Sequence, residues 1–237
     1  MTTASLPNGA IVVGIDGSES SDRALTWAAD EAALDHRPLV LVYTVGALGT
    51  PDTVWLTEDD PIVMRWRAEG EDLLAAAAQE VYGRHPSVQV QTHVVTEDAR
   101  KALLEVADRA WMIVVGSRGR GAVRSLLLGS VSAAVARHAT CPVVVVRPHH
   151  ADTVRKGVLV GADGTASSLP TLEVAYRAAS VRQLPLTVMH CVYDAVAHVT
   201  SAHVVPPDDP TLRKPVSSSP SRSQGCLRSS LKYPCSS

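Results

Sequence analysis

Short apolar runs alternate with segments of helical periodicity from the start of the chain to Arg147. The apolar runs have the length and the Val- and Ile-rich composition of buried parallel strands, and they lie near Ala10–Ile15, Leu39–Val45, Val88–Val95, Trp111–Gly116 and Pro142–Arg147. The segments between them predict helices near Ser21–Asp35, Pro61–Tyr82, Ala99–Arg109 and Ser130–His138. This alternation is typical of a parallel sheet with helices on both faces. It predicts an α/β fold with a doubly wound, five-stranded parallel sheet.

A glycine-rich segment, Gly116 to Ser130, joins the fourth predicted strand to the fourth predicted helix. Glycines let the backbone turn sharply and approach a ligand, and the N–H groups and dipole of a first helical turn favour an anion. The spacing Gly-x2-Gly-x9-Gly-Ser is neither a P-loop nor a dinucleotide fingerprint. The segment therefore predicts a phosphate-binding loop of another type, with Ser130 as the N-cap of the helix. A turn that the glycines merely shape is the alternative.

Three segments in sequence order resemble the universal stress protein family. They are Ile11–Ser21, Gly116–Ser130, which resembles the family's ATP-binding signature, and Val131–Arg147 with its Cys141-Pro142 step. The resemblance covers about residues 9–148. It implies an adenine-nucleotide α-hydrolase-like domain over residues 1–150 that binds ATP with Mg2+.

The resemblance also implies roles for single residues. Asp16, after the first strand, would contact the nucleotide and its Mg2+, with an Asx turn or helix cap as the alternative role. Thr44 would present its backbone to adenine. Gly116 and Gly119 would line the ribose and phosphates. The terminal phosphates would be held by Gly129, Ser130 and Val131.

Three arginines lie in the glycine-rich segment: Arg118, Arg120 and Arg124. Each of them would pair with phosphate oxygens or remain a solvated charge on the loop.

An internal repeat appears when the chain is shifted by 147 residues against itself. Ile11–Val45 then aligns with Val158–Val192 without a gap, and 12 of 35 positions are identical. A period of this length indicates duplicated domains, as in the tandem members of the resembling family. Residues 151–198 are thus expected to be a truncated β-α-β repeat, which could pack on the first domain, join a partner's sheet or stay partly molten.

Residues 199–237 form a Ser- and Pro-rich segment with few large apolar residues. The part from Ser201 onward contains 10 Ser and 6 Pro, a composition typical of disorder. The sequence leaves open whether this tail is native or results from a frame change.

Composition narrows the possible partners. The formal net charge is only −2, which disfavours nucleic acid, and no apolar stretch reaches the length of a membrane helix. The start of the chain has no signal-peptide pattern, so a cytoplasmic protein is expected. The 4 cysteines are widely spaced and indicate neither a metal site nor a disulfide framework.

No motif of a catalytic nucleophile or metalloenzyme occurs, so a nucleotide-dependent stress-response or signalling module is expected rather than a dedicated enzyme. A slow ATP-hydrolysing enzyme of the same fold and a nucleotide-free interaction protein are the alternatives. The resemblance further implies a homodimer formed through the edge strand Val143–Val146.

Overall fold

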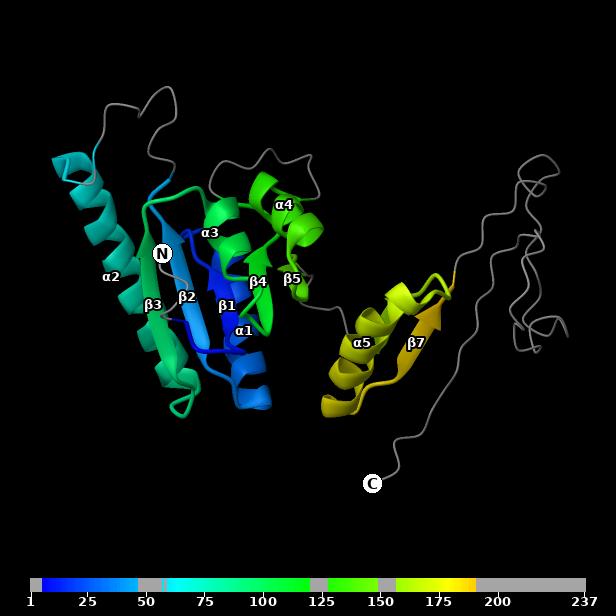
Figure 1. Ribbon diagram of the computed structural model, residues 1–237. Coiled ribbons are helices and arrows are strands. Elements are labelled where there is room, and N and C mark those ends of the chain that lie inside the picture. Colours follow the sequence, from blue (N-terminus) through cyan, green and yellow to red (C-terminus); the bar gives the residue numbers. More distant parts are fainter. Residues whose placement is uncertain (1–5, 47–56, 58, 120–127, 149–156, 191–237) are drawn as a thin grey trace, which may run out of the picture. The chain divides into compact units, whose positions relative to one another are not determined.

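The five apolar runs form one parallel sheet in the computed structural model, which describes residues 6–46, 57, 59–119, 128–148 and 157–190. The strands are β1 (Ile11–Gly14), β2 (Leu39–Thr44), β3 (Val90–Val95), β4 (Met112–Gly116) and β5 (Val143–Val146). Their order across the sheet is β3-β2-β1-β4-β5 (Figure 1). The predicted doubly wound α/β fold is therefore confirmed. The chain divides into two compact units, Met1–Ala151 and Asp152–Ser237.

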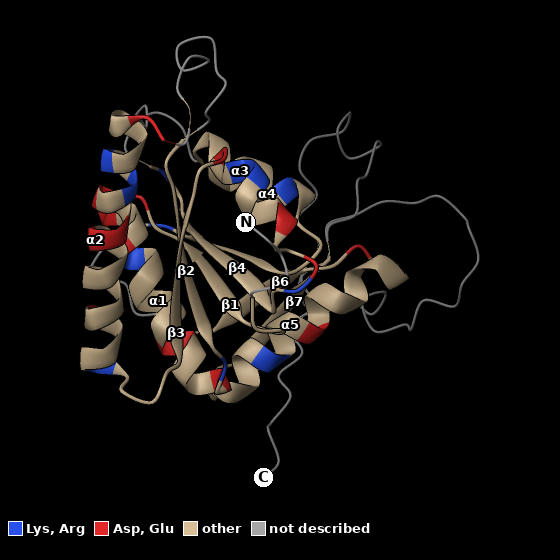
Figure 2. Ribbon diagram, turned by 60° about the vertical axis from the view of Figure 1, so that its left-hand side comes forward, with Lys and Arg blue, Asp and Glu red and all other residues tan. Residues whose placement is uncertain are grey.

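Two helices cover each face of the sheet. The helices are α1 (Glu19–Asp35), α2 (Pro61–Arg84), α3 (Ala99–Glu105) and α4 (Ser130–His138). α1 and α2 pack on one face, and α3 and α4 pack on the other. Figure 2 shows the sheet between these two layers, with the charged residues on helices and loops and not on the strands.

β1 lies at the centre of the sheet, between β2 and β4, and all of its apolar side chains are buried. Ile11 and Val13 face the layer of α1 and α2, whereas Val12 faces α3 and α4. A parallel strand covered on both faces needs apolar residues at every position, which explains why the sequence shows continuous apolar runs here.

α3 is shorter than the sequence predicts. The apolar pattern suggests a helix as far as Arg109, but the regular helix ends at Glu105. After it the backbone tightens, because Ala107 N–H donates to the Leu104 carbonyl at 3.2 Å. Val106 and Ala107 remain buried in the core, so the apolar periodicity continues beyond the helical hydrogen bonds.

Tyr43, near the end of β2, packs against α2 at a glycine. A Cβ atom added to Gly70 would lie 2.4 Å from Cδ1 of the Tyr43 ring. The ring is buried, and its Cε1 and Cγ atoms would lie 2.7 and 3.2 Å from the same added Cβ. The absence of a side chain at position 70 therefore sets how closely α2 approaches β2.

We expect Gly70→Ala to lower the free energy of unfolding by about 1–3 kcal/mol, because the added methyl group overpacks a filled core. Gly83→Ala in the same helix is the matched control, since nothing lies within 4 Å of its added Cβ. That substitution should be neutral or stabilise by up to ~1 kcal/mol. Urea unfolding of both variants measures the difference, and equal stabilities would contradict the contact.

The second unit repeats the first β-α-β segment of the first unit. Its elements are β6 (Val158–Gly161), the 3-10 turn η2 (Ala166–Ser168), α5 (Leu169–Val181) and β7 (Leu186–Met189). β6 and β7 pair in parallel with Val158 opposite Leu186, the same register as Ile11 opposite Leu39. The helix ends also agree, because His36 and Gln183, which are 147 residues apart, both have φ 51°.

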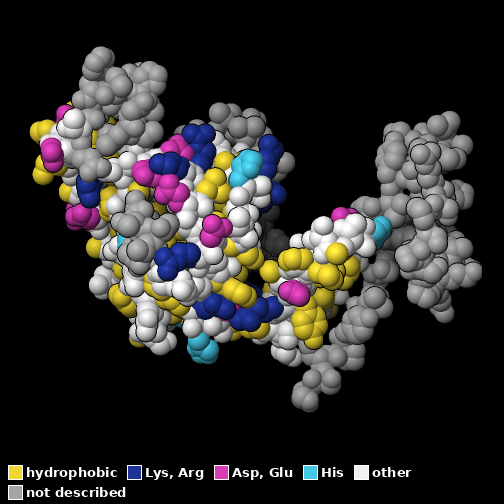
Figure 3. Space-filling view, viewed as in Figure 1, with side chains coloured by type: hydrophobic (Ala, Val, Ile, Leu, Met, Phe, Trp, Pro, Cys, Tyr) yellow, Lys and Arg dark blue, Asp and Glu magenta, His cyan; other side chains and the backbone are white. Residues whose placement is uncertain are grey.

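This smaller unit exposes apolar positions that the first unit buries. Leu159 is 64% exposed where its counterpart Val12 is 1% exposed, and Tyr176 is 61% exposed where Ala29 is 1% exposed. Figure 3 shows hydrophobic side chains gathered over this unit. Among the described residues β6 pairs with β7 alone, whereas β1 has a strand on each side. The predicted tail, residues 199–237, lies outside the described residues.

Candidate functional site

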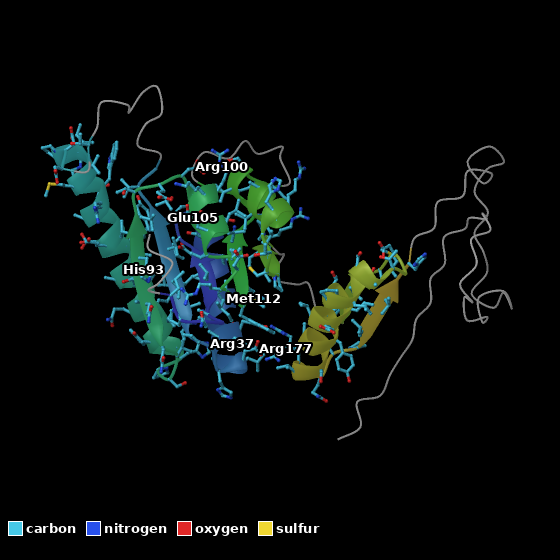
Figure 4. The ribbon with its side chains drawn as sticks, viewed as in Figure 1. Arg37, His93, Arg100, Glu105, Met112 and Arg177 are labelled. Atoms are coloured by element: carbon cyan, nitrogen blue, oxygen red, sulfur yellow. The ribbon has the colours of Figure 1, made fainter. Side chains whose placement is uncertain are left out.

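A cavity of about 450 Å3 lies at the carboxyl edge of the five-stranded sheet. It is lined by the ends of β1, β2 and β4 and by the first turns of α3 and α4. The strand order reverses between β1 and β4, and open α/β sheets bind ligands outside the carboxyl ends at such a point. Figure 4 labels a residue at each end of the strands. Arg100 of α3 lies toward their carboxyl ends, and Met112, which begins β4, lies toward their amino ends.

All eight residues that the sequence assigns to the site line this cavity: Asp16, Thr44, Gly116, Arg118, Gly119, Gly129, Ser130 and Val131. The structure thus brings together residues from three strands and one helix. Arg120 and Arg124 lie outside the described residues.

The apolar wall of the cavity was not predicted from the sequence. Its side chains come from β2, β4, α3 and the approach to α4: Val42, Ala99, Leu103, Val115 and Leu128. A wall of this kind suits the face of an aromatic base. The alternation of β2 would have placed Val42 on the same face as Thr44, but the contribution of α3 depends on tertiary packing.

Asp16 holds a tight turn between β1 and α1. Its Oδ1 accepts hydrogen bonds from the Ser18 backbone N–H at 3.0 Å and from the Ser18 hydroxyl at 2.6 Å. Ser18 in turn caps α1 by accepting the Ser21 N–H at 3.2 Å. The Asx turn considered as the alternative is therefore present, and it leaves the carboxylate in the cavity wall.

The other carboxylate oxygen of Asp16 lies beside the glycine-rich segment. A Cβ atom added to Gly119 would be 2.6 Å from Oδ2 of Asp16. The glycine therefore allows the loop backbone to pass close to this carboxylate.

The N-cap of α4 is Gly129, so the prediction that Ser130 occupies this position is wrong by one residue. Gly129 has extended backbone angles, its N–H donates to the Ser117 carbonyl at 2.7 Å, and its carbonyl accepts from Ala133 at 2.9 Å. Ser130 is then the first helical residue. Serine is a preferred N-cap, but here the hydrogen bond to Ser117 determines where the helix begins.

This arrangement changes which donors face the cavity. The N–H of Gly129 is already used, while those of Ser130, Val131 and Ser132 have no acceptor within the described part of the chain. The first N–H groups of a helix have no intrahelical partner and favour anions. The donor set at this end of the cavity is therefore Ser130 to Ser132.

Ser132 also joins α4 to the end of β4. Its side chain is 3% exposed, and its hydroxyl lies 3.2 Å from the Ser117 carbonyl oxygen and 3.1 Å from that of Gly129. Because a hydroxyl donates one hydrogen, it serves these two carbonyls alternately or as a shared donor.

Gly116, at the end of β4, packs against the first turn of α1. An added Cβ would lie 2.7 Å from the carbonyl carbon, the carbonyl oxygen and the Oγ atom of Ser20. The first glycine of the motif is thus required by the protein's own packing, whereas the sequence analysis considered only ligand approach and the shaping of a turn.

We expect Gly116→Ala to lower the free energy of unfolding by about 1–3 kcal/mol, because the methyl group would meet fixed backbone atoms. Gly129→Ser is the control, since an added Cβ there has its nearest neighbour at an ordinary 3.5 Å. It should change stability by no more than about 0.5 kcal/mol. Thermal or urea unfolding tests both, and a harmless Gly116→Ala would show that α1 and β4 separate easily.

One charged pair near the cavity is internally neutralised. The Arg100 guanidinium donates to both carboxylate oxygens of Asp98 at 2.8 Å and holds the pKa of that carboxyl below its ordinary value. Asp98 also caps α3 by accepting the Arg100 N–H at 2.9 Å. Arg100 does not line the cavity. Among the described residues, Arg118 is the arginine that does.

Residues 8–147 match the universal stress protein family, and the chain belongs to this family. It is 35% identical over 193 residues to the universal stress protein Rv2005c of Mycobacterium tuberculosis, a match covering 76% of this chain and 63% of that protein. A second relative from the same organism, Rv2623, is 35% identical over 192 residues, with 76% and 62% covered. Both relatives are tandem-domain universal stress proteins. The chain thus covers less than two thirds of the length of these curated relatives.

Solved structures agree on the fold. A universal stress protein from Archaeoglobus fulgidus superposes with a TM-score of 0.63 at 20% identity, covering 82% of this chain and 71% of that one. UspA from Lactobacillus plantarum gives a TM-score of 0.51 at 21% identity, with 60% and 100% covered. In the described part of the chain, no helix combines the length and the apolar character needed to cross a membrane.

Proposed function

We propose that the first unit binds ATP with Mg2+ and that its occupancy makes the protein a nucleotide-dependent module of the stress response. Nucleotide binding is typical of the universal stress protein family. The observation that carries the proposal is the cavity itself, which combines an apolar wall with the N-terminal N–H groups of α4. Its volume of about 450 Å3 lies within the range of small-molecule sites.

The phosphates would lie against the first turn of α4. Backbone N–H groups of Ser130, Val131 and Ser132 converge there, and the helix dipole adds to their attraction for an anion. Arg118 lines the same cavity and would pair with a phosphate oxygen.

The adenine ring would occupy the apolar end of the cavity. Val42 and Leu103 supply aliphatic contacts on this side, and Thr44 lies at the end of β2 beside them. Thr44 would recognise the ring edge through its backbone.

The Mg2+ ion would be held mainly by the nucleotide. Within the described residues no group of three or more His, Cys, Asp or Glu side chains could hold a metal ion. Asp16 is the carboxylate that lines the cavity, so it would complement phosphate oxygens around the ion.

Calorimetric titration of the full chain with ATP and Mg2+ should give one nucleotide per chain, because the glycine-rich segment occurs once in the sequence. Asp16→Asn should weaken binding by about tenfold, since it removes the charge. The Asn amide oxygen can still accept the Ser18 hydrogen bonds that hold the turn.

The repeat supplies the control for this titration. Asp163→Asn changes the equivalent carboxylate of the second unit, whose Oδ1 accepts the Thr165 N–H at 2.9 Å in the same kind of turn. That variant should bind ATP as the unmodified chain does. A stoichiometry of two, or equal losses in both variants, would contradict a site confined to the first unit.

The proposal includes a homodimer that forms through β5. This strand is the last in the sheet, and among the described residues it pairs with β4 alone. Val143 to Val146 are all apolar and half-buried, and an open apolar edge is an association site unless something covers it.

We place the protein in the cytoplasm, where its nucleotide is available.

The hydrogen-bond pattern identifies the residue that tests this edge. The carbonyls of Pro142 and Val146 accept from β4 and the residue that follows it, so in a parallel ladder Val145 directs its N–H and carbonyl to the open side. Val145→Pro should convert dimer to monomer in sedimentation at micromolar concentration, because proline removes the outward donor and spares the bonds to β4. Val145→Thr keeps the donor and should remain dimeric. A monomeric unmodified chain would contradict the proposed dimer.

A further inference from the structure

Ser20 is a buried polar residue in the first turn of α1. It is 6% exposed, although serine at such a position usually faces water. Its Oγ accepts the backbone N–H of Arg118 at 3.3 Å, a contact between residues 98 positions apart. The hydrogen bond joins α1 to the beginning of the glycine-rich segment.

The Ser20 hydroxyl has no role in capping its own helix. Ser18 is the N-cap and accepts the Ser21 N–H, and the Ser21 hydroxyl donates to the Ser18 carbonyl at 2.8 Å. Burial of a hydroxyl is unfavourable unless it is hydrogen-bonded. The Arg118 N–H is the partner that the described residues provide.

The path of the chain after β4 is held from two sides. On one side the Ser20 backbone and hydroxyl meet Gly116 and Arg118. On the other side the Ser117 carbonyl accepts from Gly129 N–H and from the Ser132 hydroxyl. Three consecutive residues, 116 to 118, are therefore fixed between α1 and α4, and two of them, Gly116 and Arg118, line the cavity together with Gly119.

We infer that Ser20 is a positioning residue of the proposed nucleotide site, acting through its hydrogen bond to Arg118 to fix the backbone of residues 116–119. The inference rests on the proposed ATP binding for its effect on affinity. Ser20 does not itself line the cavity. Its contribution is to hold Arg118 and Gly119 where a bound phosphate requires them, so that binding does not have to order these two residues.

The repeat contains the same serine without the loop. Ser167 is the counterpart of Ser20 at a distance of 147 residues, and it is exposed. No glycine-rich segment follows in the second unit. Substitution at Ser167 therefore changes the same residue type at the equivalent position of the repeat, in η2, without touching the proposed contact.

The test uses the full chain with Ser20→Ala, and with Ser20→Cys as a second variant that keeps a γ atom but replaces the oxygen acceptor by a larger sulfur. Calorimetry with ATP and Mg2+ should show affinity reduced by about threefold to tenfold in both. In nucleotide-free protein, hydrogen exchange of the Arg118 amide should accelerate while amides in β1 keep their protection. Ser167→Ala should leave ATP affinity and Arg118 exchange unchanged.

The outcomes separate this inference from the proposed function. Unchanged affinity and unchanged Arg118 exchange in both Ser20 variants would overturn the positioning role, as would an equal effect of Ser167→Ala. An unmodified chain that binds no ATP would overturn the proposed function. The Arg118 amide in nucleotide-free protein would then still decide whether Ser20 positions the loop.

Discussion

The close approach of α1 to the end of β4 is the constraint on which the site depends. Gly116 lies so near Ser20 that a methyl group would not fit between them. Because α1 follows directly from β1, this contact couples the turn at Asp16 to the loop that begins 100 residues later. One packing contact thereby positions two parts of the cavity wall, the turn at Asp16 and the segment that begins at Gly116.

The elements around the cavity divide the chemical tasks. Strand ends and α3 supply apolar surface, since they also belong to the core that buries Val42 and Leu103. α4 supplies backbone donors, because the hydrogen bond from Gly129 to Ser117 starts the helix at the cavity. Asp16 and Arg118 add one charge of each sign.

Much of the fold was predictable because buried parallel strands need apolar residues at every position. All five strands and four helices occur where the periodicity indicates. The errors concern hydrogen bonds that periodicity does not report. α3 ends early while its buried residues continue the apolar pattern, and α4 begins at Ser130 because Gly129 takes the cap position.

The residues that the resemblance assigned to the site line one cavity, since a parallel sheet brings the ends of its strands to one edge. The physical reason why each of these residues is needed was harder to predict from the sequence. The resemblance assigned Gly116 and Gly119 to a ligand, whereas the structure places Ser20 and Asp16 within 3 Å of an added Cβ. Ser20 and Ser132 were missed because a serine near a helix start looks like an ordinary cap. Only tertiary structure shows that their hydroxyls meet residues of another element.

The duplicated segment separates what folding requires from what binding requires. Asp163 forms the same turn as Asp16, and hydrogen bonds from Ser168 and Thr165 lower its pKa to about 2. Such a turn therefore stabilises the start of a helix in both units and is no evidence for a ligand by itself. The donors and most of the apolar wall come instead from β4, α3 and α4, and the described residues of the repeat contain no counterpart of these elements. In the proposed site, Asp16 would therefore depend on the second half of its domain, through the contact between Ser20 and the end of β4.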